Sequence, residues 1–285
     1  MTATLPPSAG VIGWPVAHSK SPLIHRFWLE KLGLDGDYGR FPVHPDRLGE
    51  AIRALPAFGL RGVNVTVPHK QAVLPHLDRI DEMASQVGAV NTIVVEDDGL
   101  VGYNTDAEGF LEPLRPLLAR SWLFKMARII GTGGAALAIA HALHAQGFTI
   151  VVIGRDLAKA RAVRAGFAPD DSLITTIDSF RRPLDFVWDD RSGVLDLVVN
   201  ATSLGMAGQP PLGIDFSNVP PGAVVYDIVY SPLETPLLAE ARARGHAVVD
   251  GLSMLIGQAA LAFERFFGAS PPREHDAELR TLLTS

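Results

Sequence analysis

The segment "RGVNVTVPHK", residues 61–70, places three polar groups at the end of a short strand. Its valines alternate with polar residues, which is the period-2 pattern of a strand with one buried face, and its proline then ends the strand. The amide of Asn64, the hydroxyl of Thr66 and the ammonium of Lys70 therefore gather at the carboxyl end. Together these hydrogen-bonding groups and the one positive charge suit a small polar or anionic molecule.

Other isolated polar residues also stand at strand ends or helix starts in the first part of the chain. Ser19 and Ser21 lie in "HSKSP", Asn91 in "GAVNT" and Asp106 in "GYNTDAEG". In a parallel sheet such positions converge on one crevice outside the carboxyl ends of the strands. Serine hydroxyls at a helix start can hold a carboxylate, so the set predicts a site for a polyhydroxylated, anionic small molecule.

Each of these residues also has an ordinary structural explanation. Ser21 can cap a helix, and Asn64 can lie on the solvated face of an edge strand. Lys70 can be a surface lysine, and Asp106 can be a turn or cap residue. Their coincidence at strand ends favours the ligand site over these separate explanations.

The motif "GTGGAA" follows a predicted strand and precedes a predicted helix, which is the context of a dinucleotide phosphate loop. Gly131 allows a tight turn, and Gly133 lets the backbone approach a pyrophosphate. Gly134 and Ala135 keep the helix start small, and its free N–H groups favour an anion. A tight strand-to-helix turn without a ligand is the alternative.

The next strand, "VVIGRD", ends about twenty residues downstream, where such folds bind the adenosine ribose. After Gly154, the side chains of Arg155 and Lys159 suit a 2′-phosphate, whereas Asp156 suits a free 2′-hydroxyl. A solvated arginine is the alternative for Arg155. We therefore expect NADP rather than NAD as cofactor.

Strands and helices alternate along the chain, which predicts largely parallel sheets. First come strands at "AGVIG", "GDYGRFPVH" and "RGVNVTVP", helices at "SPLIHRFWLEKLGL", "PDRLGEAIRALPAFG", from about residue 69 and at 81–87, and a hairpin at "NTIVVEDDGLVGYN". From about residue 127 a second pattern begins, with strands at "ARIIG", "FTIVVIGRD", "DLVVNAT", "AVVYDIVY" and "HAVVDG" around the helix "AALAIAHALHAQG". Residues 169–193 predict a loop with short elements, and the apolar helix "SMLIGQAALAFERFFG" is expected to pack on the first domain.

Composition limits the classes of function. The chain has 285 residues and a net charge of −6, so it provides no basic field for nucleic acid or anionic membranes. It has no cysteine, and the spacing of its histidines predicts no metal site. The uncharged stretch 129–154 is broken by glycine, histidine and glutamine, which argues against a membrane span. The N-terminus lacks a secretory signal pattern, so we expect a cytoplasmic protein.

At this point the motifs resemble those of the shikimate dehydrogenases. These are "GVIGWPVAHSKSP", "NVTVPHK", "GAVNT", "GYNTDAEG", "GTGGAA", "NATSLGM", "YDIVYSPLETPLL" and "GLSMLIGQAALAF", in the family's order. The resemblance implies reversible, NADPH-dependent reduction of 3-dehydroshikimate to shikimate, on the route to chorismate and the aromatic amino acids. It also implies two α/β domains with a cleft between them. The substrate domain, with a mostly parallel sheet, would comprise residues 1–106 and 251–285, and a Rossmann-like NADP-binding domain residues 107–250.

Carried over motif by motif, the resemblance also implies roles for individual residues. Ser19 and Ser21 would hold the substrate carboxylate, and Lys70 and Asp106 would be the catalytic pair. Substrate hydroxyls would be held by Asn64, Thr66, Asn91, Asp106 and Gln258, with Tyr230 reaching in from the other domain. The cofactor would lie along Gly131, Gly133, Gly134, Ala135, Gly154, Arg155, Asp156 and Lys159, with Thr202, Ile228 and Gly251 at its nicotinamide end and Glu82 approaching it.

The catalytic pair follows from the chemistry of hydride transfer. Hydride arriving at a carbonyl carbon leaves negative charge on oxygen, which must receive a proton. Lys70 can supply both the charge and the proton, while Asp106 holds the lysine and a neighbouring hydroxyl in place. Three alternatives stay open, namely an NAD-dependent quinate/shikimate dehydrogenase, a non-catalytic sensor that keeps dinucleotide and metabolite binding, and an amino-analogue enzyme of a biosynthetic cluster. We expect a monomer or a homodimer.

Overall fold

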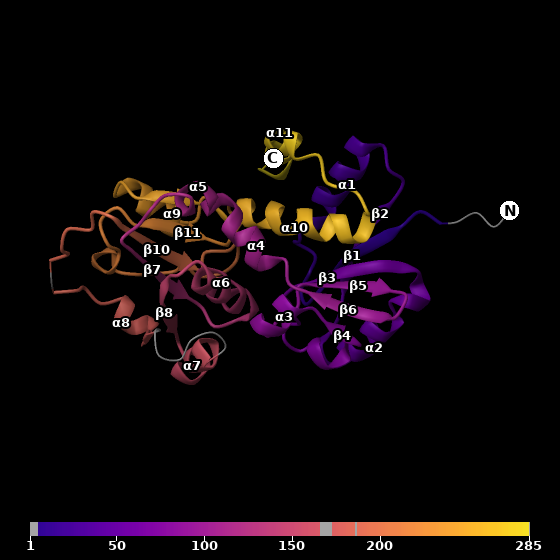
Figure 1. Ribbon diagram of the computed structural model, residues 1–285, viewed down its shortest axis with the longest axis horizontal. Coiled ribbons are helices and arrows are strands. Elements are labelled where there is room, and N and C mark those ends of the chain that lie inside the picture. The colour runs from indigo at the N-terminus through magenta and orange to yellow at the C-terminus, as the bar shows by residue number, and fades with distance from the viewer. Residues whose placement is uncertain (1–4, 166–172, 186, 285) are drawn as a thin grey trace. The chain divides into compact units, whose positions relative to one another are not determined.

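The computed structural model describes residues 5–165, 173–185 and 187–284. The chain divides into two compact units. Unit 1 comprises Met1–Thr105 and Ile256–Ser285, and unit 2 comprises Asp106–Leu255. The chain therefore leaves unit 1 once, builds unit 2 and returns, as the colours of Figure 1 show.

Unit 1 contains a mixed sheet of six strands in the order β2-β1-β3-β5-β6-β4. Their bounds are Ser8–Gly13 for β1, Asp37–Pro42 for β2, Leu60–Val65 for β3, Arg79–Ile80 for β4, Thr92–Glu96 for β5 and Gly99–Tyr103 for β6. Strand β1 pairs in parallel with β2 and β3, and β4 pairs in parallel with β6. Strand β5 runs antiparallel to β3 and β6, so the expected hairpin around "EDDG" is present.

The helices of unit 1 begin and end where local sequence signals place them. Helix α1 has Pro22 in its first turn and ends at Gly33, whose φ of 62° is the left-handed conformation that glycine adopts readily. Helix α10 lies so close to β3 that a Cβ on Gly62 would stand 2.6 Å from the ring of Phe266. The α-helices are α1 (Ser21–Leu32), α2 (Leu48–Ala54), α3 (Glu82–Val87), α10 (Gly251–Phe267, which starts in unit 2) and α11 (Asp276–Thr284). The 3-10 helices are η1 (Pro45–Arg47), η2 (Pro56–Phe58), η3 (Leu74–His76) and η6 (Arg273–His275).

The helix expected from about His69 is wrong. The chain there makes turns and then the short 3-10 helix η3. The carbonyl of Lys70 accepts the N–H of Val90, outside the segment, and Pro75 has no N–H to donate to the carbonyl four residues earlier. Val73 donates to the carbonyl of His69 four residues earlier, but Leu74 donates to the carbonyl of Gln71 only three residues earlier, so the i−4 pattern of an α-helix does not continue.

Unit 2 contains six parallel strands in the order β12-β11-β10-β7-β8-β9. The central strands are long valine- and isoleucine-rich runs, as expected for a parallel sheet buried on both faces. Their bounds are Phe124–Ile130 for β7, Thr149–Gly154 for β8, Leu173–Thr176 for β9, Val194–Asn200 for β10, Val224–Asp227 for β11 and Ala247–Val249 for β12. Unit 2 is therefore Rossmann-like, and the predicted class of two α/β sheets is confirmed.

The helices of unit 2 are α4 (Asp106–Leu111), α5 (Arg115–Leu118), α6 (Gly134–Ala145), α7 (Leu157–Ala165), α8 (Ile177–Phe180) and α9 (Pro236–Ala243), with η4 (Glu112–Leu114) and η5 (Phe216–Asn218). The loop expected over residues 169–193 falls partly outside the described residues, and its described part includes β9 and α8. Among the described residues, no helix combines the length and apolarity required to cross a membrane.

Candidate substrate and nucleotide sites

The two serines of "HSKSP" are buried at the start of α1. The Ser19 hydroxyl donates to that of Ser21 over 3.3 Å and accepts the Ser21 backbone N–H at the same distance. Lys20, not Ser21, is the N-cap residue of α1, and its side chain makes no capping bond. Arg40 donates two hydrogen bonds, of 2.9 and 2.6 Å, to the carbonyl of Ser19, which brings positive charge to this corner. The capping explanation for Ser21 is therefore wrong.

Tyr38, on β2, connects the serines to Asn64, and no sequence motif points to it. Its hydroxyl donates to the Asn64 side-chain oxygen over 2.6 Å and also hydrogen bonds Ser21. Burial raises the pKa of Tyr38 well above its usual value of 10.0, so the hydroxyl keeps its proton as a donor. A single tyrosine in a strand is usually interpreted as a core residue. Only the pairing of β1 with both β2 and β3 brings Tyr38 next to Asn64.

The network continues from Asn64 across the sheet. The Asn64 amide donates to the Thr92 hydroxyl over 2.9 Å, and this hydroxyl donates to the Asn91 side-chain oxygen over 3.0 Å. Asn91 donates to the Thr105 hydroxyl over 2.9 Å and to the Gln258 side chain over 3.5 Å. All five side chains are buried, so Asn64 does not lie on a solvated face. Thr92 and Thr105 were not predicted as site residues. Each follows an asparagine at a strand end, and nothing in the sequence distinguishes such a threonine from an ordinary one.

Three further predicted residues of the substrate site are Thr66, Lys70 and Asp106. Thr66 follows β3, is half-buried, and bonds the carbonyl of Ile12 through its backbone N–H. Lys70 is half-buried in the turns after β3. Asp106 is buried and opens α4 in unit 2, so it belongs to a different unit from Lys70. The pairing of Lys70 with Asp106 therefore stays a prediction.

The glycine motif forms the turn from β7 into α6. Gly131 has a φ of 136°, and a Cβ there would lie 2.7 Å from the carbonyl oxygen of Ala201, so only glycine fits. A Cβ on Gly133 would meet nothing within 4 Å, and Gly133 is an N-cap without a side chain to cap the helix. Gly134 and Ala135 start α6, whose first turn contains no acidic residue. Open space in front of uncapped N–H groups fits a phosphate.

The residues at the end of β8 distinguish a 2′-phosphate from a free 2′-hydroxyl on the bound ribose. Asp156 accepts the N–H groups of Ala158 (2.8 Å) and Lys159 (3.4 Å), so its carboxylate caps α7. A capping carboxylate has less capacity left for a ribose hydroxyl. Arg155 and Lys159 are exposed beside it, and Gly154 packs closely on the side chain of Thr132. This end of the sheet fits a 2′-phosphate better than a free 2′-hydroxyl.

The residues predicted at the nicotinamide end follow β10, β11 and β12. Thr202 donates its hydroxyl to the Asn200 side chain over 2.7 Å, and the backbone N–H of Ile228 bonds the Asn200 carbonyl. A Cβ on Gly251 would lie 2.3 Å from the Ile228 carbonyl oxygen, so this contact requires glycine. Tyr230 is half-buried in the loop after β11.

Glu82 lies in unit 1, exposed on α3, where its carboxylate accepts the amide of Gln86. Its predicted approach to the cofactor stays a prediction.

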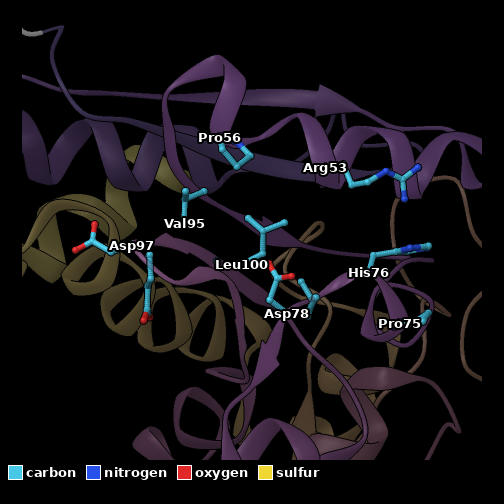
Figure 2. Close-up of a pocket in the computed structure, with 11 residues that line it drawn as sticks. Arg53, Pro56, Pro75, His76, Asp78, Val95, Asp97 and Leu100 are labelled. Carbon is cyan, nitrogen blue, oxygen red and sulfur yellow. Dashed lines mark hydrogen bonds between the residues drawn. The ribbon is translucent and has the colours of Figure 1, made fainter.

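A pocket of about 570 Å³ in unit 1 lies at the opposite end of β5 from the buried network (Figure 2). Figure 2 shows Arg53 and His76 on one side of it and Asp78 with Leu100 at its centre. Asp78 accepts the N–H of Leu100, and Glu96 accepts the hydroxyl of Tyr103, so these carboxylates serve the β5–β6 hairpin. The predicted site residues do not line this pocket.

Unit 2 has an all-parallel sheet with an open glycine turn at α6, and unit 1 is an α/β unit with a buried polar network. These features define a class of protein with two α/β units, one of which has a Rossmann-like nucleotide fold. Family models narrow this class. Residues 11–93 match the shikimate dehydrogenase substrate binding domain, and residues 251–278 match the shikimate 5′-dehydrogenase C-terminal domain.

Full-length relatives agree. The chain is 48% identical over 279 residues to the shikimate dehydrogenase (NADP(+)) of Rhodospirillum rubrum, covering 95% of each chain. It is 48% identical over 284 residues to the enzyme of the same name from Sphingopyxis alaskensis, covering 98% of this chain and 97% of that one. The structure of shikimate 5-dehydrogenase from Thermus thermophilus with NADP(H) and shikimate superposes with a TM-score of 0.77 at 36% identity, covering 97% and 99%. The chain belongs to the shikimate dehydrogenase family, so the predicted family is confirmed.

Proposed function

We propose that the protein is an NADP-dependent shikimate dehydrogenase that reversibly reduces 3-dehydroshikimate to shikimate. The observation that carries this proposal is the near-full-length identity of 48% to relatives named for that activity and cofactor. The capping of α7 by Asp156, beside exposed Arg155, also supports NADP over NAD.

The substrate's carboxylate fits the start of α1, where Ser19 and Ser21 lie. Ser19 and Ser21 offer hydroxyl donors there, and Arg40 adds positive charge through the Ser19 carbonyl. Ring hydroxyls fit the amides of Asn64 and Asn91, whose geometry is held by the threonines between them. Each side chain of this network is neutral and can both donate and accept hydrogen bonds, so a polyol can bind without any change of protonation in the network.

In the proposed reaction, the glycine turn at Gly131 and Gly133 would hold NADP, which would supply the hydride for the carbonyl carbon as NADPH and accept it as NADP⁺ in the reverse direction. Lys70 stabilises the negative charge that develops on the substrate oxygen and transfers the proton to it. Asp106 orients Lys70 and accepts a hydrogen bond from the neighbouring substrate hydroxyl. Gln258 and Tyr230 complete the polar contacts to the substrate.

The test is an absorbance assay at the nicotinamide band with shikimate or quinate and with NADP⁺ or NAD⁺. We expect turnover of shikimate with NADP⁺ to be the most efficient of the four combinations. Efficient turnover of quinate with NAD⁺ would favour the quinate/shikimate dehydrogenase alternative. Binding of both ligands without turnover would favour the sensor.

A substitution isolates the catalytic pair in the same assay. Asp106→Asn keeps the size of the side chain but removes its charge, so turnover should be severely impaired. Near-normal turnover would contradict the paired role of Lys70 and Asp106.

A cytoplasmic enzyme that works as a monomer or a homodimer is part of the same proposal. Light scattering of the purified protein separates the two oligomeric states.

A further inference from the structure

Asp227, the last residue of β11, is the centre of a buried polar cluster in unit 2. One carboxylate oxygen accepts the amide of Asn200 over 2.9 Å and the backbone N–H of Val229 over 3.0 Å. The other accepts the hydroxyl of Thr235 over 2.7 Å. Asp227, Asn200 and Thr235 are each fully buried.

The cluster ties together two loops at the carboxyl edge of the sheet. The side-chain oxygen of Asn200 accepts both the N–H and the hydroxyl of Thr202, and its amide donates to the carbonyl of Leu204. This fixes the start of the loop after β10. Val229 and Thr235 stand near the beginning and the end of the loop after β11, and Thr235 also caps α9. One carboxylate therefore sets the position of both loops.

A carboxylate is a costly choice for this position. Burial raises the pKa of Asp227 to about 6, and its three partners are all neutral donors. An asparagine could accept the bonds from Asn200 and Val229 with its oxygen and donate to the Thr235 hydroxyl with its amide. The geometry of the cluster, rather than the charge alone, is thus the property to test.

We propose that Asp227 is a positioning residue for the nicotinamide end of the bound nucleotide, acting through the loops that carry Thr202 and Ile228. The inference rests on the proposed function, which assigns those two residues to that end. Thr202 is held by Asn200, and Ile228 lies between Asp227 and Val229 with its N–H on the Asn200 carbonyl. The adenosine end, at Arg155, follows β8, which lies on the other side of β7 from β10 and β11 in the sheet.

The test compares two probes that share only the adenosine end. NADPH binding is followed by its fluorescence, and binding of adenosine 2′,5′-bisphosphate, which lacks the nicotinamide, by calorimetry. The variants are Asp227→Ala, which removes both acceptor oxygens and their three bonds, and Thr235→Val, which leaves the carboxylate but removes the hydroxyl's bond to it and the N-cap bond from Leu238. Asp227→Asn is the matched control because it can keep the hydrogen-bond geometry.

We expect Asp227→Ala and Thr235→Val to weaken NADPH binding by about tenfold or more and to change binding of the bisphosphate by less than about twofold. Asp227→Asn should keep both affinities near those of the parent. If Asp227→Ala fails to fold, Thr235→Val decides.

Equal losses for both probes, or unchanged NADPH binding in a folded variant, would overturn the positioning role and leave the proposed function intact. A parent protein that binds neither probe would overturn both proposals.

Discussion

His25 is one side chain through which acid should destabilise unit 1. Its ring is fully buried on α1, stacked on Tyr38 with centroids 4.0 Å apart and edge-on to Trp28 at 5.9 Å. Within the described part of the chain, neither ring nitrogen has a hydrogen-bond partner. Burial lowers the pKa of His25 from 6.5 to about 3, because a charged imidazolium would have neither water nor an acceptor there.

The sign and size of the effect follow from linkage. The unfolded chain binds a proton at His25 below pH 6.5, whereas the folded chain does so only near pH 3. The stabilisation is therefore complete above pH 6.5 and is lost as the pH falls toward 3. At 1.36 kcal/mol per pH unit, the loss reaches about 2 kcal/mol at pH 5.

The assay is urea unfolding of the parent and of His25→Phe at pH 8 and pH 5, followed by tryptophan fluorescence and circular dichroism. At pH 8 the two proteins differ only by packing and by the loss of two unpaired nitrogens, which gives the reference. Between pH 8 and pH 5, the parent should lose about 2 kcal/mol more unfolding free energy than the variant. Equal losses in the two proteins would refute the assignment of acid sensitivity to His25.

Three further predictions concern catalysis, cofactor choice and stability. Lys70→Ala should lower kcat by a factor on the order of 10² to 10⁴ with little change in KM; an effect on KM alone would make Lys70 a binding residue. Arg155→Ala should raise KM for NADP⁺ and leave KM for NAD⁺ nearly unchanged. Steady-state kinetics with both cofactors measures the two KM values, and the opposite pattern would contradict the prediction. Asp196→Ala should cost about 3–5 kcal/mol in urea unfolding, because it leaves the buried Arg128 guanidinium without its 2.8 Å partner. The exposed control Glu240→Ala, at the 2.6 Å pair with Arg244, should cost about 1 kcal/mol or less, and equal costs would contradict the burial argument.

Local patterns were reliable where one short segment carries the whole signal. The glycine turn could be read from "GTGGAA" because the strand, the turn and the helix start are contiguous, and Gly131 does require glycine. The hairpin at "EDDG" was read correctly for the same reason. The helix from about His69 was wrong because the Lys70 carbonyl has a partner, Val90, from another part of the chain.

The buried network could be predicted only in part. Asn64 and Asn91 were identified as site candidates from their places at strand ends, but Tyr38, Thr92 and Thr105 were missed. Each of these three residues, taken by itself, has an ordinary structural explanation. Its partner becomes visible only when strands from different parts of the chain are aligned.

By itself, the sequence determined most of the order of strands and helices, the glycine turn, the family and the residue types available for binding a polar anion. Those properties depend on spacing along a single segment or on motifs in order. The tertiary structure alone decided which polar groups meet, as when Asn91 bonds Gln258 across 167 positions of the chain. It also decided that Ser21 is not a helix cap and that Asp156 is one. The physical reason is that a buried polar group must find a partner, and the fold determines which partners are within reach.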